Sequence, residues 1–198
     1  ATADLAGLEG ASVQLVIVPD EEASAPGPNC TEMLVADGLR ADLVICGEPT
    51  DMQVGVQAKG VLMLRAQVNG IAAHGSTPWL GQSAILAGID LYQRIAQLPF
   101  AAASTELFAQ PSINLGRING GDAVNKVADH CVLDIDVRYL PGQDPADVLR
   151  QIRGLGDWTV EVLLEREPAD VDPRHPLVMT LLDATSVHEP SSASVGRD

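Results

Sequence analysis

The segment Cys131–Leu140, CVLDIDVRYL, decides the fold class that we expect for this sequence. Apolar and polar residues alternate from Leu133 to Tyr139. The apolar positions are Leu133, Ile135, Val137 and Tyr139, and the polar positions are Asp134, Asp136 and Arg138. Because successive side chains of a strand point to opposite faces, this alternation predicts a β-strand with one face buried and the other facing water.

The segments on either side of this strand complete one predicted domain. Further strand candidates lie at residues 61–69, 112–118 and 159–165. Residues 82–98 predict an amphipathic helix, and Asp144 followed by Pro145 predicts the start of a second helix. The predicted apolar faces are Ile85, Ile89, Tyr92 and Ala96 in the first helix, and Val148, Leu149, Ile152 and Leu155 in the second. The order β-α-β-β-α-β predicts a ferredoxin-like sandwich, an antiparallel four-stranded sheet with two helices on one face.

The N-terminal part of the chain shows a different pattern. Ser12–Pro19 and Ala41–Pro49 are short, almost unbroken apolar runs, which are typical of strands buried on both faces of a parallel sheet. Residues 29–39 between them have helical spacing, so a right-handed βαβ unit is predicted. One more helix is predicted for His175–Val187. We therefore expect an α/β protein in which the sandwich is inserted into a partial parallel α/β domain. The expected boundaries are 1–57 and 169–198 for the parallel domain and 58–168 for the sandwich.

Composition and charge restrict the class of protein. Apolar residues make up 46% of the 198 residues, so a packed core is expected, and the net charge of −15 disfavours nucleic acid and anionic membranes as partners. The cysteines, Cys30, Cys46 and Cys131, show no paired spacing, which favours a reducing compartment. With no signal peptide and no apolar run of about 18 residues, a cytoplasmic protein is expected. Because the sequence starts without methionine and stops at SVGRD without a closing element, we also expect a piece of a longer protein.

Carboxylates follow both predicted parallel strands. The first strand runs into VIVPDEE, Val16–Glu22, and the second ends at Glu48. Ligands of α/β proteins bind at the carboxyl ends of parallel strands, so Glu22 and Glu48 are candidates for holding a metal ion, while Glu21 points elsewhere. The alternative is a solvated acidic loop. A zinc site usually needs three or four ligands that include histidine, and no histidine precedes Glu21.

Four motifs, in this order, resemble the M20 family of metal-dependent amidohydrolases. They are VPDEE, GEPTD, AKGVLMLRAQVNGIAAHGSTPWLGQSAI and GGDAVNKVADHCVLDIDVRYLPGQD, and they cover roughly residues 13–145. The family includes acetylornithine deacetylase, succinyl-diaminopimelate desuccinylase, aminoacylase and glutamate carboxypeptidase. The resemblance implies that the parallel domain is catalytic and that residues 58–168 form the lid, or dimerisation, domain, through which the protein pairs with a second copy.

The resemblance also implies roles for the carboxylates. Glu21 would be the general base that takes a proton from a metal-bridging water. Glu22 and Glu48 would each ligate one of two metal ions, usually zinc, with cobalt or manganese as possible substitutes. The implied reaction is the hydrolysis of an N-acyl amide or peptide bond next to a carboxylate.

Three residues of the lid domain match positions with roles in the family. His74 would reach the active site of the partner subunit and stabilise the tetrahedral oxyanion. Asn125 and Arg138 would hold the substrate carboxylate or the oxyanion. From the residues alone, the favoured interpretation of His74 is a loop histidine that caps its own backbone, and that of Arg138 is an exposed strand residue beside Asp134 and Asp136. Lys59 and Gly60 mark the crossing between the domains and are assigned no chemistry.

The sequence also departs from the family. The His-x-Asp and bridging Asp ligands that precede the VPDEE strand are missing, and the last histidine ligand lies beyond Asp198. His188 is interpreted as a helix-end histidine. We therefore expect this chain alone to be inactive and to bind no metal. The main alternative is a non-catalytic, acidic α+β dimerisation module. A nucleotide-binding enzyme is excluded because GLEG and GRINGG do not follow strands with GxGxxG spacing.

Overall fold

A computed structural model describes residues 10, 12–20, 27–51, 53–185 and 191–192. The chain divides into two compact units, unit 1 from Ala1 to Val44 and unit 2 from Ile45 to Asp198. Unit 2 contains the predicted sandwich. In the described residues, no helix is long and apolar enough to cross a membrane.

Unit 1 contains one of the predicted elements. Helix α1, Cys30–Ala36, begins at a capping box in which Asn29 and Glu32 exchange side-chain and backbone hydrogen bonds. The chain leaves the helix through Gly38, whose φ of 102° is a conformation that glycine adopts without strain. The helix predicted between the two apolar runs is therefore confirmed.

The parallel strands predicted on either side of α1 are not formed. Neither Ser12–Pro19 nor Ala41–Pro49 is in a strand, and the side chains of Leu15 and Ile17 are 85% and 84% exposed. A parallel strand needs neighbours for its backbone groups and cover for both faces, and no described strand pairs with these segments. The prediction of a βαβ unit is therefore wrong for the described part of the chain.

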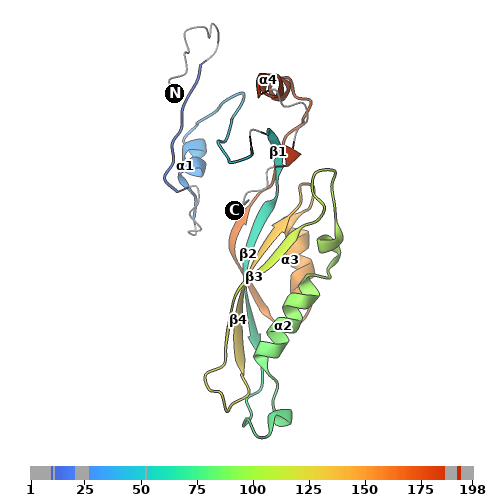
Figure 1. Ribbon diagram of the computed structural model, residues 1–198. Coiled ribbons are helices and arrows are strands. Elements are labelled where there is room, and N and C mark those ends of the chain that lie inside the picture. The colour runs from blue at the N-terminus through green and yellow to red at the C-terminus, as the bar shows by residue number, and fades with distance from the viewer. Residues whose placement is uncertain (1–9, 11, 21–26, 52, 186–190, 193–198) are drawn as a thin grey trace. The chain divides into compact units, whose positions relative to one another are not determined.

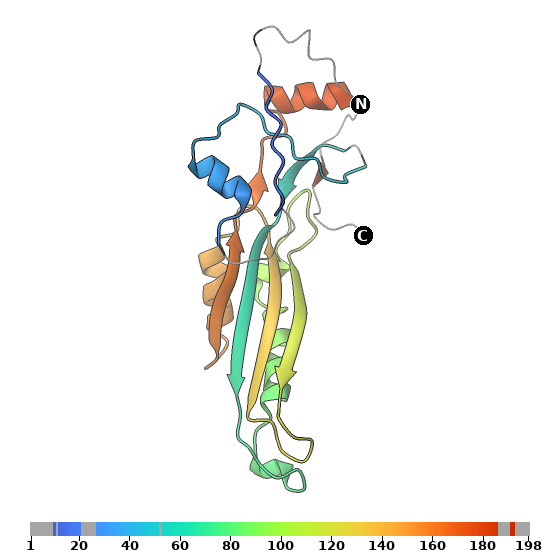
Figure 2. The ribbon, with the colours of Figure 1, turned by 90° about the vertical axis from the view of Figure 1, so that its left-hand side faces the viewer.

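The lid sheet of unit 2 has the predicted topology. Its strands are β2 (Gly60–Asn69), β3 (Ser112–Gly120), β4 (His130–Tyr139) and β5 (Thr159–Arg166). They are all antiparallel and lie in the order β3-β4-β2-β5. Helices α2 (Ala84–Ile95) and α3 (Pro145–Arg153) lie on the same face of the sheet, as Figures 1 and 2 show. This arrangement confirms the ferredoxin-like sandwich.

The buried face of α2 differs from the predicted one. The helix buries Ala84, Gly88, Leu91 and Ile95, whereas Ile89 is 39% exposed, Ala96 is also exposed, and Ile85 and Tyr92 are half-buried. The reason is close packing, because a Cβ atom at Gly88 would lie 2.9 Å from Cδ1 of Leu133 on β4. The helix turns Ala84 and Gly88, together with Leu91 and Ile95, toward the sheet, and it leaves Ile89 outside.

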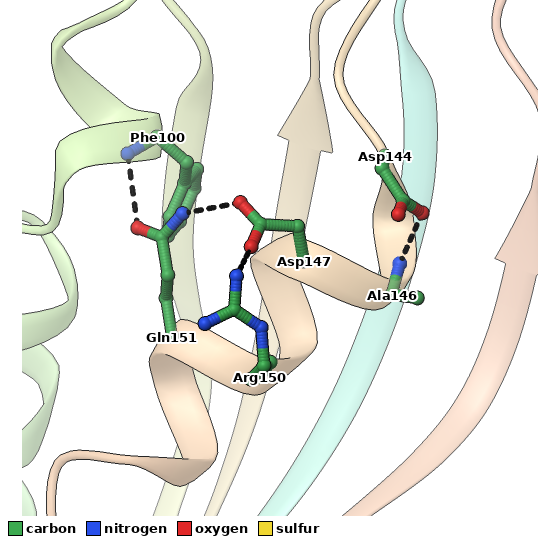
Figure 3. Close-up of polar contacts among 6 residues, drawn as sticks. All are labelled: Phe100, Asp144, Ala146, Asp147, Arg150 and Gln151. Atoms are coloured by element: carbon green, nitrogen blue, oxygen red, sulfur yellow. Dashed lines mark hydrogen bonds and ion pairs between the residues drawn. The ribbon is translucent and has the colours of Figure 1, made fainter.

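The second helix, α3, begins at the predicted Asp144 cap, whose side chain accepts a hydrogen bond from the backbone N–H of Ala146. Val148 and Ile152 are buried as predicted, and Leu149 and Leu155 pack against the core at partial exposure. Figure 3 shows how the outer face of α3 is held. Asp147 contacts Arg150 and accepts a bond from Gln151, and Gln151 accepts one from the backbone N–H of Phe100 in η2, Pro99–Ala102.

A small three-stranded sheet precedes and follows the lid. Its strands are β1 (Gly55–Ala58), β6 (Ala169–Asp170) and β7 (Ser191–Ser192), in the order β6-β1-β7. Strand β1 is parallel to β7 and antiparallel to β6. The predicted C-terminal helix is α4, Pro176–Thr185, which buries Val178 and Leu182 against Val56. Lys59 is the one residue between β1 and β2.

Candidate functional residues at the two ends of the lid

His74 and Asn125 lie together at the end of the lid where β2 finishes. Two loops, residues 70–83 and 121–129, form what we call the distal tip. The backbone N–H of Gly75 donates to the carbonyl oxygen of Asn125 at 2.7 Å, and that of Val127 donates to Ala73 at 2.9 Å. The side chains of both His74 and Asn125 are exposed. The tertiary structure therefore brings two predicted site residues to one place, although 51 positions separate them in the sequence.

The imidazole ring of His74 is oriented by its own loop. Its Nδ1 atom lies 3.1 Å from the backbone nitrogen of Ser76 and 2.8 Å from the Ser76 hydroxyl. A backbone N–H can only donate, so Nδ1 accepts this bond and the proton of the neutral ring is on Nε2. Nε2 makes no hydrogen bond with a described residue. His74 thus presents an N–H donor to whatever approaches the tip.

Lys126 stabilises the second loop of the tip. Its ammonium group lies 3.0 Å from Asp122 and 3.1 Å from Asp129. These hydrogen bonds, first to Asp122 and then to Asp129, raise the pKa of Lys126, and the contact with Lys126 lowers the pKa of Asp129. Lys126 is therefore paired within its own loop, next to Asn125.

Arg138 lies at the opposite end of the sheet. It is on β4, paired with Val61 of β2 and Ser112 of β3, and its Nε donates to both oxygens of Asp136 at 2.9 and 3.1 Å. In the described structure its terminal guanidinium nitrogens make no hydrogen bond. They are free to bind a carboxylate.

Asp134, the other acid beside Arg138 in the sequence, has different partners. Arg65 on β2 binds it through two hydrogen bonds of 2.8 and 3.0 Å, and Arg117 on β3 lies 3.6 Å away. The hydrogen bond from Arg65 is the main cause that lowers the pKa of Asp134. Arg65, Asp134 and Arg117 form one charge cluster across β2, β4 and β3, separate from the pair of Arg138 and Asp136.

The predicted metal ligands are not assembled in the described structure. Glu48 is half-buried in unit 2, seven residues before β1. Glu21, Glu22 and His188 lie outside the described residues. Among the described residues, no group of three or more His, Cys, Asp or Glu side chains could hold a metal ion. The described residues therefore do not fit the two-metal centre by themselves.

The site residues occur in two separate groups within unit 2. Strand β2 has 10 residues and spans roughly 30 Å. His74 follows its far end, whereas Arg138 pairs beside its first residues and Glu48 precedes β1. Figures 1 and 2 show the tip and the segment before β1 at opposite ends of this unit. One copy of the chain cannot bring His74 to Glu48.

The antiparallel four-stranded sheet with two helices on one face defines the class of this domain as a ferredoxin-like α+β sandwich. Residues 56–157 match the family model of the M20 peptidase dimerisation domain. The match covers slightly more than half of the 198 residues. The chain belongs to the M20 family through this domain.

Solved structures show the same fold at low sequence identity. A tripeptidase from Staphylococcus aureus is 23% identical with a TM-score of 0.52, and the match covers 74% of this chain and 40% of that chain. Aminopeptidase PepT from Bacillus cereus is 22% identical with a TM-score of 0.52, covering 73% and 41%. A hydantoinase/carbamoylase family amidase from Burkholderia multivorans is 17% identical with a TM-score of 0.51, covering 72% and 38%. The chain therefore spans about 40% of the length of these proteins.

Proposed function

We propose that this chain is the lid domain and part of the catalytic domain of a cytoplasmic metal-dependent hydrolase. The full-length protein would cleave an N-acyl amide or peptide bond next to a carboxylate. The observation that carries the proposal is the distal tip, where His74 presents an Nε2–H donor beside Asn125. The proposed domains are 1–57 and 169–198 for the catalytic part and 58–168 for the lid. The tripeptidase and amidase activities named for the solved relatives agree with this reaction class.

The residues of this chain would have four roles in the reaction. Glu21 would take a proton from the attacking water, and Glu22 and Glu48 would be ligands of two zinc ions. Zinc, when bound, supplies an acidified water and polarises the carbonyl. Nε2–H of His74, together with Asn125, would donate hydrogen bonds to the oxyanion. Arg138 would bind the carboxylate of the substrate through its terminal nitrogens.

A complete active site would need two copies of the protein. Glu48 and Arg138 lie near one end of unit 2 and His74 and Asn125 near the other. The first pair would serve the site of its own chain, and the second pair that of the partner. Dimerisation would therefore be part of catalysis.

Zinc binding tests the metal ligands. The full-length protein is expected to bind about two zinc ions per chain, measured by isothermal titration. Replacing Glu22 or Glu48 with alanine should remove at least one of them, because an oxygen ligand is lost. This chain alone should bind none tightly, since it lacks the other ligands. Glu161→Ala is the matched control, because Glu161 is an exposed acid on β5. Unchanged binding in the Glu22 and Glu48 variants would refute the proposed metal site.

The second candidate function, pairing with another copy, is favoured by the edge strand β3. The other edge strand, β5, carries exposed Glu161 and Glu165, and its Val160 carbonyl accepts a hydrogen bond from Arg153. Charged residues on an edge strand discourage strand pairing. Strand β3 has the single charge of Arg117, and the neighbouring helix α2 exposes Leu86 to 68%. We propose that β3 and α2 form the homodimer interface.

A charge placed on α2 should weaken this dimer. Leu86→Glu is expected to raise the dimer dissociation constant of this chain about tenfold or more, because it buries a carboxylate in an apolar contact. Size-exclusion chromatography with light scattering measures the change. Thr159→Glu introduces the same charge at an exposed position of the opposite edge strand, β5, and should have a small effect. Equal effects of the two substitutions would contradict an interface at Leu86.

A further inference from the structure

Trp79 differs from every other aromatic residue of this protein. The chain has two Trp, two Tyr and two Phe residues, all within the described ranges. Phe100, Phe108 and Tyr139 are buried, and Tyr92 and Trp158 are half-buried. Trp79 is 75% exposed, and its neighbour Leu80 is 69% exposed. The other aromatic residues of this protein are buried or half-buried. The exposure of Trp79 therefore points to a contact surface.

The exposed cluster is rigidly connected to His74. Trp79 and Leu80 belong to the short helix η1, Pro78–Leu80, in the first loop of the distal tip. The backbone N–H of Thr77 donates to the carbonyl oxygen of His74 at 2.9 Å, and that of Leu80 donates to Thr77 at 3.1 Å. His74 and Trp79 are thus joined by consecutive hydrogen-bonded turns.

The base of this loop is closed. Ile71 and Gln82 exchange two backbone hydrogen bonds of 2.8 Å, and a Cβ atom at Gly81 would lie 2.6 Å from the carbonyl oxygen of Ile71. Ile71 is itself 53% exposed, so the loop carries a third exposed large apolar side chain. Because these backbone contacts hold the two ends of the loop together, we expect Trp79 and His74 to move as one unit. A force that positions Trp79 therefore also positions the ring of His74.

We propose that Trp79, with Leu80 and Ile71, docks onto a second copy of this protein and thereby holds His74 over the scissile bond bound by that copy. This inference rests on the proposed hydrolase function. Trp79 is a positioning residue, since it acts through His74 and does not touch the reacting atoms.

Two observations favour a second copy as the occupant. Within unit 2, His74 and Glu48 lie beyond opposite ends of the strands β1 and β2, so the tip does not meet Glu48 of its own chain. In addition, residues 56–157 match a dimerisation domain, which favours a second copy of this chain as the partner. The chain's net charge of −15 argues against an anionic membrane as the occupant.

Kinetics of the full-length protein give the first test. Trp79→Ala is expected to lower kcat about 10- to 100-fold while KM changes little, because a hot-spot contact that orients His74 is lost. Trp79→Phe should restore most of the activity. Val171→Ala is the control, since Val171 is a 45% exposed apolar residue outside the lid. An unchanged kcat in Trp79→Ala would overturn the proposal.

Cross-linking tests the contact independently of activity. A benzophenone amino acid at position 79, in dimers mixed from ¹⁴N- and ¹⁵N-labelled chains, should cross-link the two isotopically different chains. The same group at position 171 is the control. Cross-links within one chain only, or to lipid when vesicles of phosphatidylcholine and phosphatidylserine are added, would overturn the docking. Cross-links between the two chains, together with a full-length protein that has an intact Trp79 and hydrolyses no N-acyl amide or peptide bond, would support the docking and overturn the proposed function instead.

Discussion

Replacing His74 with alanine is expected to lower kcat of the full-length protein by about 10²- to 10³-fold. The backbone N–H of Ser76 donates a hydrogen bond to Nδ1 of His74, so the ring proton is on Nε2. This N–H at the surface of the tip would stabilise the oxyanion. The folded state should not suffer, because the His74 side chain is exposed and buries no apolar surface. Steady-state kinetics with an N-acyl amino acid substrate, together with urea unfolding, separates the two effects.

His130→Ala is the matched control for this substitution. His130 is also an exposed histidine of the lid, at the start of β4, and its ring Nδ1 lies 3.5 Å from Oδ1 of Asn69. It should leave kcat unchanged. Mixing the His74→Ala protein with an inactive Glu21→Ala protein should restore part of the activity, because one mixed dimer then contains one intact site. No recovery in the mixture would argue against action of His74 in the partner subunit.

The largest loss of stability is expected from Gly70→Ala, where β2 enters the distal tip. A Cβ atom there would lie 2.2 Å from the carbonyl oxygen of Gln82, 2.8 Å from the nitrogen of Ala84 and 2.9 Å from the carbonyl oxygen of Ala128. All three are backbone atoms, so no side-chain rotation can relieve the overlap. The free energy of unfolding should fall by about 2–3 kcal/mol, as measured by urea denaturation of this chain.

Gly116→Ala on β3 provides the comparison. The nearest atom to its added Cβ is the carbonyl oxygen of Asp134 at 3.6 Å, an ordinary contact. This substitution should be neutral or slightly stabilising, because alanine has fewer unfolded conformations to lose. Equal free energies of unfolding for Gly70→Ala and Gly116→Ala would contradict the close approach of the two tip loops to β2.

Local sequence patterns predicted the lid well where one physical signal dominated. Strict alternation in Cys131–Leu140 predicted β4, and Asp144-Pro145 predicted the start of α3. The inner face of α2 was predicted incorrectly, because hydrophobicity favoured Ile85 and Ile89 over the small Gly88. Helix α2 packs so close to the sheet that only a small residue fits at position 88. The sequence of the helix does not show this distance, because it depends on how the helix and the sheet pack together.

The apolar run Ser12–Pro19 failed as a strand prediction for a related reason. Its composition suits a central parallel strand, but a strand is formed only when neighbouring strands accept its backbone hydrogen bonds. No described strand does so. Trp79 lies within one of the family motifs, and that motif assigns it no role. The signal that could have found it was a large apolar pair, Trp79-Leu80, in a loop otherwise made of small and polar residues.

The sequence by itself determined the sandwich, its order of elements and its family, because alternation, helix caps and ordered motifs are local properties of the chain. Only the tertiary structure decided which functional residues meet. The pairing of β2 with β4 brings the loop of His74 beside that of Asn125, and it places Arg138 opposite Val61 at the other end of β2. Contacts between residues so far apart in the sequence depend on strand register, and register is determined when the two faces of the sheet are packed.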